Sequence, residues 1–347
     1  MLKKIYFILP FLLTAFLVNS QVVINEYSAS NFDSHLDNYG EYEDWVELYN
    51  TTNSDIDLNG WSLTDKPANL PKWSFTGSFI VSANSVAIIY CSGRDELVGG
   101  VAHTNFKITQ TKAGEVFVLS DASGNIIDSA RAIPAQKSHS RGRDVNGGSS
   151  WSVFTTATPN TSNTGAMLEY APLPIFSQSS GYYSAPFDLT LSCADPNAIL
   201  YYTTDGSKPD NSANLYTGPF NISSTSVVKA VAYSTNGLVP PSFIDYHTFF
   251  INDTHTVPIL SVSGDSVAVL IEDGLQNIGS WWNGTPHEPQ GTIEWFDKNG
   301  VLIDKGTGEF NKHGNDSWAY DQRGFDYVMR DQFGYNHALQ DLSLIHI

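Results

Sequence analysis

Acidic side chains near the start of the chain are the first candidates for chemistry. Hard cations such as Ca²⁺ take several carboxylate oxygens as ligands, and five acids here offer them: Glu26, Glu41, Glu43, Asp44 and Glu47. We expect a cation site, with Ca²⁺ as its candidate ion, if the fold brings these five together. The alternative is that Glu26 and Glu47 are structural and that the other three belong to a solvated loop.

A second acidic segment, Asp55–Gly60, matches the first half of a D-x-[DN]-x-[DN]-G calcium loop. The twelfth position of that loop must be Glu, and here it is Lys66. Ile56 and Leu58 also alternate as residues of a strand do. The segment is therefore not interpreted as a calcium loop.

Three tyrosines, Tyr201, Tyr202 and Tyr216, are the candidates for binding carbohydrate. Their flat rings can stack on the faces of sugar rings. The alternative is that they pack in a core with their hydroxyl groups at its rim, as tyrosines on strands often do.

The composition limits the function. The chain has 347 residues, enough for two or three domains, and 41% of them are hydrophobic. Its formal net charge of −18 disfavours binding to nucleic acid. The two cysteines, Cys91 and Cys193, end apolar strands in separate predicted domains, so we expect small core residues and no disulfide framework.

Residues 1–20 have the pattern of a secretory signal peptide. Lys3 and Lys4 precede the apolar run Ile5–Val18, and Val18 and Ser20 stand at the −3 and −1 positions of a cleavage site. We expect a secreted or cell-surface protein without a transmembrane segment after cleavage; a retained N-terminal anchor is the alternative. At the other end, residues 341–347 contain LSLIHI (342–347), which resembles a translated sequencing adapter, so we expect the natural chain to continue; a short natural apolar tail is the alternative.

The segment 21–163 alternates short apolar runs with turn residues and shows no helical period. At its centre, Trp45–Tyr49 and Ile56–Leu58 alternate on either side of a polar turn, which predicts a β-hairpin. We expect an all-β sandwich organised around this hairpin.

The same segment contains a series of motifs in a fixed order: VVINEYSASN, GEYEDWVELYN, DLNGWSLTD, HTNFKI, VFVLSDASGNIIDS, SHSRGRD and SSWSVFTTATPNTSN. This series resembles the bacterial lamin-tail domain. The resemblance implies an immunoglobulin-like β-sandwich with a role in binding or attachment and no catalytic residues.

After a linker at 164–174, residues 175–251 again alternate strand-sized runs with turns. In the segment ILYYTTDGSKPD, Asp205-Gly206 supplies a tight turn and Pro209 stiffens its exit. With LYTGPFNI and VVKAVAYSTNGLVPPS, it resembles the C-terminal β-sandwich of chitobiases and hexosaminidases. That domain is accessory to catalysis in those enzymes.

In residues 256–340, Asn299-Gly300 lies between two alternating runs and predicts a hairpin. The order VPILSVS, IEWFDKNG, GEFNKHGNDSWAYDQRGFDYVMRDQFGYN resembles the opening strands of the CotH kinase-like family, an atypical protein-kinase fold. The resemblance places Lys312, His313 and Gly314 near the nucleotide; the alternative is a solvent-exposed turn. The acids that hold magnesium in that family lie beyond this sequence.

The sequence therefore predicts a mainly β protein with two tandem immunoglobulin-like β-sandwiches followed by an incomplete α+β domain. We expect an exported binding or attachment protein whose partner is an extracellular protein or a glycan, non-catalytic and without a cofactor as given. The alternatives are a secreted protein kinase using ATP and Mg²⁺ in its full-length form, and a carbohydrate-binding accessory protein.

Overall fold

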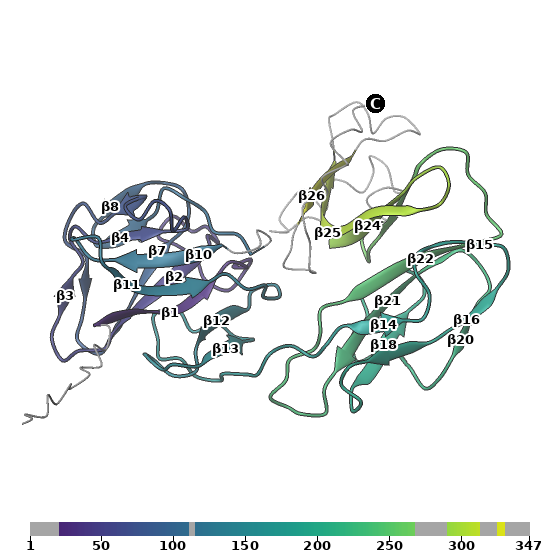
Figure 1. Cartoon of the computed structure of the whole chain (residues 1–347), viewed down its shortest axis with the longest axis horizontal. Coiled ribbons are helices and arrows are strands. Elements are labelled where there is room, and N and C mark those ends of the chain that lie inside the picture. The colour runs from purple at the N-terminus through teal and green to yellow at the C-terminus, as the bar shows by residue number, and fades with distance from the viewer. Residues whose placement is uncertain (1–20, 111–114, 268–289, 313–324, 330–347) are drawn as a thin grey trace, which may run out of the picture.

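The structure is a computed structural model of the whole chain, and it describes residues 21–110, 115–267, 290–312 and 325–329. Every regular element with bounds inside these ranges is a β-strand. The strands form three successive domains: the first lies at the left of Figure 1, the second at the right, and the sheet of the third lies above the second. The described residues include no helix that is long and apolar enough to span a membrane.

The first domain is a sandwich of two main sheets. The larger contains, in spatial order, β13 (Trp151–Phe154), β12 (Ser140–Arg143), β1 (Val22–Ser28), β2 (Trp45–Asn50), β7 (Val86–Tyr90), β9 (Val101–His103) and β8 (Glu96–Val98). The smaller contains β11 (Ile126–Arg131), β10 (Val116–Ser120), β4 (Ser62–Thr64) and β5 (Trp73–Ser74). Buried apolar side chains from both sheets, such as Ile24, Leu48 and Phe117, fill the space between them.

The predicted hairpin at the centre of this domain is wrong. β2 does not pair with β3 (Ile56–Asp57); it pairs with β1 and β7. β3 instead pairs with β6 (Ile80–Val81) in a small separate sheet. Asn50 explains the departure, because its side-chain amide donates to the carbonyls of Ser54 and Val81 and turns the chain away from β2. Alternation predicts strands, but it does not predict which strands pair.

The second domain is a smaller sandwich. Its main sheet contains β15 (Gly181–Tyr183), β22 (Asp245–Ile251), β21 (Ser226–Tyr233), β18 (Ile199–Thr203) and β19 (Asn214–Leu215). Two short pairs complete it: β14 (Pro174–Phe176) with β17 (Leu191–Cys193), and β16 (Phe187–Leu189) with β20 (Phe220–Ile222). Cys193 lies partly buried against the core of this domain, whereas Cys91 is fully buried in the first.

The third domain contributes one antiparallel sheet in the order β23 (Ile259–Ser263), β24 (Gln290–Phe296), β25 (Leu302–Lys312) and β26 (Phe325–Met329). The predicted hairpin is confirmed, since β24 and β25 pair across the turn at Asn299-Gly300. Gly300 has φ +81, a left-handed conformation that glycine adopts without steric cost. The helical part of the predicted α+β domain stays a prediction.

Specific contacts join the first domain to the second. Tyr170, in the predicted linker, packs edge-on against Phe243 with ring centroids 5.1 Å apart. Its neighbour Glu169 accepts two hydrogen bonds, both 2.8 Å long, from the guanidinium of Arg141 in β12. The linker is therefore fixed to both domains: Tyr170 contacts the second, and Glu169 pairs with the first at two points, which sets orientation as well as distance.

The third sheet rests on the second domain. The carboxylate of Glu294 in β24 accepts hydrogen bonds from Ser180 and Thr248 of the second domain. The ammonium of Lys305 in β25 lies 2.7 Å from Asp245 at the start of β22. These polar contacts hold β24 and β25 against the second domain.

Candidate functional site

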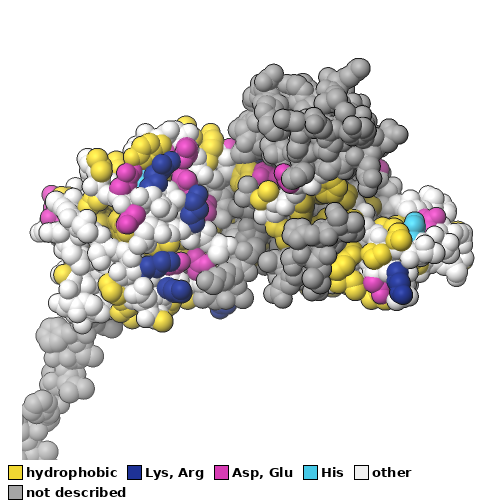
Figure 2. Space-filling model, turned by 90° about the horizontal axis from the view of Figure 1, so that it is seen from above, with side chains coloured by type: hydrophobic (Ala, Val, Ile, Leu, Met, Phe, Trp, Pro, Cys, Tyr) yellow, Lys and Arg dark blue, Asp and Glu magenta, His cyan; other side chains and the backbone are white. Residues whose placement is uncertain are grey.

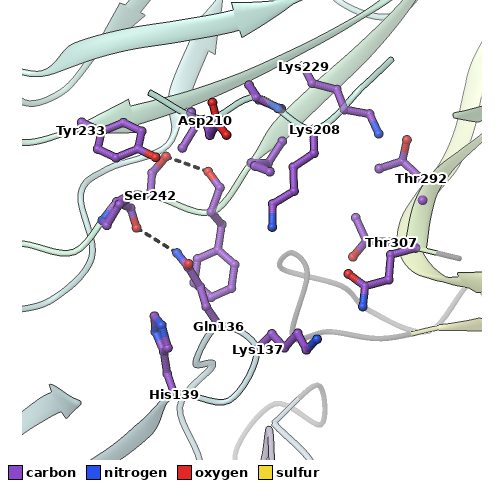
Figure 3. Close-up of a pocket in the computed structure, with 17 residues that line it drawn as sticks. Gln136, Lys137, His139, Lys208, Asp210, Lys229, Tyr233, Ser242, Thr292 and Thr307 are labelled. Atoms are coloured by element: carbon purple, nitrogen blue, oxygen red, sulfur yellow. Dashed lines mark hydrogen bonds between the residues drawn. The ribbon is translucent and has the colours of Figure 1, made fainter. Parts of the chain in front are cut away.

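A cavity of about 400 Å³ lies where the three domains meet (Figure 3). This volume is within the range of small-molecule sites, roughly 300–1,000 Å³. Its described lining comes from a first-domain loop, from the turn, strands and loops of the second domain, and from β24 and β25 of the third: Gln136, Lys137, His139, Lys208, Pro209, Asp210, Lys229, Val231, Tyr233, Pro241, Ser242, Phe243, Ile244, Gln290, Gly291, Thr292 and Thr307.

Hydrogen bonds to the second domain and the linker hold the first-domain loop in place. The side-chain amide of Gln136 donates to the carbonyl of Pro241 at 2.8 Å, and its backbone N–H donates to the hydroxyl of Tyr170 at 3.0 Å. The ring of His139 stacks on Tyr170, with Nδ1 2.9 Å from the same hydroxyl. Burial lowers the pKa of His139 to about 4, so this ring is neutral at pH 7 and contributes no charge to the cavity.

Three lysines and one aspartate supply the charge of the described lining. Lys137 is paired with Asp33 at 3.0 Å, so part of its charge is already neutralised. Asp210 lies in the turn after Lys208 and accepts hydrogen bonds from the backbone and hydroxyl of Ser212. The cavity is thus basic on balance, although the whole chain is strongly acidic.

Lys229 is the least expected of these residues. It lies in β21 between Val228 and Ala230, which face the core, so its own side chain points to the opposite face of the sheet. The third domain covers that face and leaves Lys229 only 3% exposed. This burial lowers the pKa of Lys229 to about 8.

The five predicted cation ligands do not converge. Only Glu26 and Glu47 lie together, as cross-strand partners of β1 and β2. Glu41 instead pairs with Arg94, and Glu43 pairs with Lys107; such pairs of basic and acidic side chains are interspersed on the first domain in Figure 2. Across the described ranges, no group of three or more His, Cys, Asp or Glu side chains could hold a metal ion.

Glu26 and Glu47 anchor the end of the first domain. Glu26 accepts hydrogen bonds from Ser140 and from the backbone and hydroxyl of Thr158. Glu47 accepts one from Asn25 at 3.1 Å and one from the backbone N–H of Asn160 at 2.7 Å. Burial raises the pKa of Glu47 to about 8 and also raises the pKa of Glu26. Their contacts are structural, and Asp44 likewise accepts a backbone hydrogen bond, from Asn31.

The three candidate sugar-binding tyrosines do not share one surface. Tyr202 stacks on Phe220, with ring centroids 4.1 Å apart, and packs with Tyr216 against the core of the second domain. Tyr201 follows the opposite face of β18 and lies edge-on to Tyr233, 5.5 Å between centroids. A single stacking platform made from all three is therefore absent.

Of the three residues predicted near a nucleotide, the structure describes only Lys312. Lys312 ends β25, where its backbone pairs with Phe325 of β26. His313 and Gly314 lie outside the described residues.

Two parts of the chain match models of known families. Residues 18–133 match the Lamin Tail Domain, and residues 178–242 match the Chitobiase/beta-hexosaminidase C-terminal domain. The first two modules are domains of these two kinds. Both matches agree with the immunoglobulin-like sandwiches described above. A search of curated proteins found no match to the chain.

Neither the cavity nor its two central lysines, Lys208 and Lys229, was predicted from the sequence. One signal was present, since Lys229 interrupts the otherwise apolar run VVKAVAY. A charged residue inside such a run is rarely buried without a reason. Nothing in the sequence marked Lys208 as a site residue, because a solvent-exposed lysine is common in a turn.

Proposed function

We propose that this chain is the binding part of an exported modular protein that acts at the cell surface or in the extracellular matrix. The observation that carries the proposal is the cavity of about 400 Å³ to which all three domains contribute lining residues. Ligand sites occur preferentially at domain interfaces. The two matched families fit a modular binding or carbohydrate-associated protein, so the proposed ligand is an extracellular glycan.

The contacts around the cavity support a preformed site. Tyr170 and Gln136 hold the first domain against the second, and Glu294 and Lys305 hold the third. A site that is already organised loses less conformational entropy on binding than one assembled by its ligand. We therefore propose that the lamin-tail domain helps to form the wall of the site, in addition to a role in attachment.

Retention on immobilised polysaccharides tests the proposal. The protein would be passed over chitin, peptidoglycan and alginate, together with the variant Lys208→Trp, which fills the cavity from an exposed turn. Lys298→Trp is the matched control, since Lys298 is exposed in the β24–β25 turn away from the cavity lining. We expect retention on at least one polysaccharide, lost in Lys208→Trp and kept in the control. Equal retention of both variants would contradict the assignment of the cavity.

Export is a separate part of the proposal. The first described strand begins at Val22, directly after the predicted cleavage position. Expression of the whole gene in a secreting host, followed by N-terminal sequencing of the secreted protein, should give a chain that starts at Gln21. A cell-associated protein that keeps residues 1–20 would support the alternative of a retained anchor.

A second candidate function is a secreted atypical protein kinase in a longer form of the chain. It is favoured by β23, β24 and β25, which overlap the segments VPILSVS, IEWFDKNG and GEFNKHG that carry the CotH resemblance. Re-sequencing the gene across codon 341 would give the natural reading frame. The extended protein should then transfer labelled phosphate from ATP in the presence of Mg²⁺, and a frame that stops at Ile347 would refute this function.

A further inference from the structure

Lys229 has fewer partners than a buried ammonium group needs. The group carries three N–H donors, and among the described residues the only acceptor within hydrogen-bond distance is the carbonyl oxygen of Ser263, at 3.4 Å. That distance is at the long limit of a hydrogen bond. A charged group that is 97% shielded from solvent is stable only when opposite charge or several acceptors compensate it.

The carboxylates around Lys229 do not supply that compensation by contact. Asp265, Glu294 and Asp205 affect it electrostatically, but none forms an ion pair with it within the described ranges. Each is already engaged: Asp265 accepts from the backbone N–H of Lys208, Glu294 from Ser180, and Asp205 from Ser207. The ammonium of Lys229 thus retains donor capacity at the wall of the cavity.

Lys208 supplies a second cation to the same space. Figure 3 shows Lys208 and Lys229 entering from the second domain, with Thr292 and Thr307 on the side of the third. Lys208 forms no side-chain ion pair with the described residues, and its backbone is fixed by Asp265 at 2.6 Å. Lys137 contributes less positive charge because it is paired with Asp33. The negative charge of Asp210, in the same lining, partly offsets that of the two lysines.

We propose that the cavity binds a uronate sugar, with the carboxylate between Lys208 and Lys229 and the sugar hydroxyls against the polar groups of β24 and β25. A carboxylate has about four acceptor positions, enough for two ammonium groups. The hydroxyl of Thr292 already exchanges a hydrogen bond with Ser263 at 2.7 Å, next to the carbonyl that Lys229 contacts. The inference rests on the proposed binding function and specifies its ligand class.

Calorimetric titration of the full chain with D-glucuronate, D-glucose and sodium sulfate tests the inference. We expect glucuronate to bind and glucose to bind at least about tenfold more weakly, since a hydrogen bond to a charged group contributes about that much. Sulfate should also bind more weakly than glucuronate, because it offers no hydroxyl-bearing ring to the threonine side of the cavity. Equal binding of glucose or of sulfate, or no binding of glucuronate, would overturn the inference.

Two variants and a control test whether the charges of Lys208 and Lys229 bind the carboxylate of glucuronate. Lys208→Glu and Lys229→Met should each weaken glucuronate binding by about tenfold or more, whereas Lys298→Glu should not. Lys229→Met keeps the length of the side chain and removes a buried charge, so it should fold at least as well as the parent protein. If it fails to fold, Lys208→Glu, which changes an exposed turn residue, decides the matter. Unchanged binding in Lys208→Glu would overturn the inference.

The two proposals can fail separately. If polysaccharides retain the protein through a cavity that Lys208→Trp blocks, but glucuronate does not bind, the binding function stands and the ligand class is wrong. If Lys208→Trp is retained like the parent protein, the cavity is not the site and both assignments fall.

Discussion

At the level of single residues, Glu26 and Glu47 show that buried acidic side chains can be structural and need not bind a cation. A cluster of acids suggests a cation site, yet these two carboxylates accept hydrogen bonds from Asn25 and from donors in residues 140–160. Glu47 lies across from Glu26 in the sheet, and the negative charge of Glu26 adds to burial in raising the pKa of Glu47 to about 8. The pair is therefore a source of pH-dependent stability.

The direction of that dependence follows from proton linkage. Between the ordinary pKa of Glu47, 4.5, and its folded value of about 8, the folded protein binds more protons than the unfolded chain. The free energy of unfolding should consequently fall as the pH rises from 4.5 to 8. Denaturant unfolding at pH 5 and pH 8 should show a smaller loss in Glu47→Gln than in the parent protein.

Glu41→Gln is the matched control for that experiment, because Glu41 is exposed and pairs with Arg94 at the surface. It should follow the pH dependence of the parent protein. If Glu47→Gln also follows it, the burial of Glu47 has no energetic consequence and the structural role assigned to it is wrong.

At the level of elements, the turn of the third-domain hairpin is also an interdomain contact. Gly300 lies against the ring of Tyr182 in β15, and a Cβ atom at this position would collide with Cδ2 of that ring. The left-handed conformation thus serves both the turn and the approach of the third sheet to the second domain. Substitution should affect the packing of domains as well as the hairpin.

Gly300→Ala should therefore destabilise the protein more than strain alone explains. Gly124 is a close control, since it has φ +82 but nothing within 4 Å of its built Cβ. Alanine in this conformation costs roughly 1–2 kcal/mol at either position, and only Gly300→Ala adds the collision with Tyr182. Thermal unfolding should show a lower midpoint for Gly300→Ala than for Gly124→Ala. Equal midpoints would mean that the third sheet does not rest on Tyr182 in solution.

The strands themselves were largely predictable, and their pairing was not. Alternation located Trp45–Asn50 and the hairpin at Asn299-Gly300, because period-two patterning and turn residues are local properties. It failed at Ile56–Asp57, where side-chain bonds of Asn50 redirect the chain. The cavity was beyond prediction for the same reason, since its lining joins residues as distant in sequence as Gln136 and Thr307.

For the whole molecule, Tyr170 is the residue on which the approach of the first two domains depends. Its hydroxyl contacts Gln136 and His139, and its ring packs on Phe243. Tyr170→Phe keeps the ring and leaves the N–H of Gln136 without that acceptor, at a cost of roughly 1–3 kcal/mol. Small-angle scattering should show a more extended particle, or thermal unfolding a lower midpoint.

Tyr201→Phe is the comparison variant, because the ring of Tyr201 packs edge-on against Tyr233 and phenylalanine retains that ring contact. It should behave like the parent protein in both measurements. Identical behaviour of Tyr170→Phe and Tyr201→Phe would show that the hydroxyl of Tyr170 does not hold the first domain in place.

If the junction of the three domains is a ligand site, bound ligand should shield its lysines from chemical labelling, and lysine footprinting measures this. The protein would be labelled with an amine-reactive reagent, with and without a polysaccharide that retains it, and each lysine quantified by mass spectrometry. We expect the ligand to protect Lys208 from labelling and to leave the labelling of Lys298 unchanged. Equal labelling of Lys208 in both conditions would contradict a site at the junction.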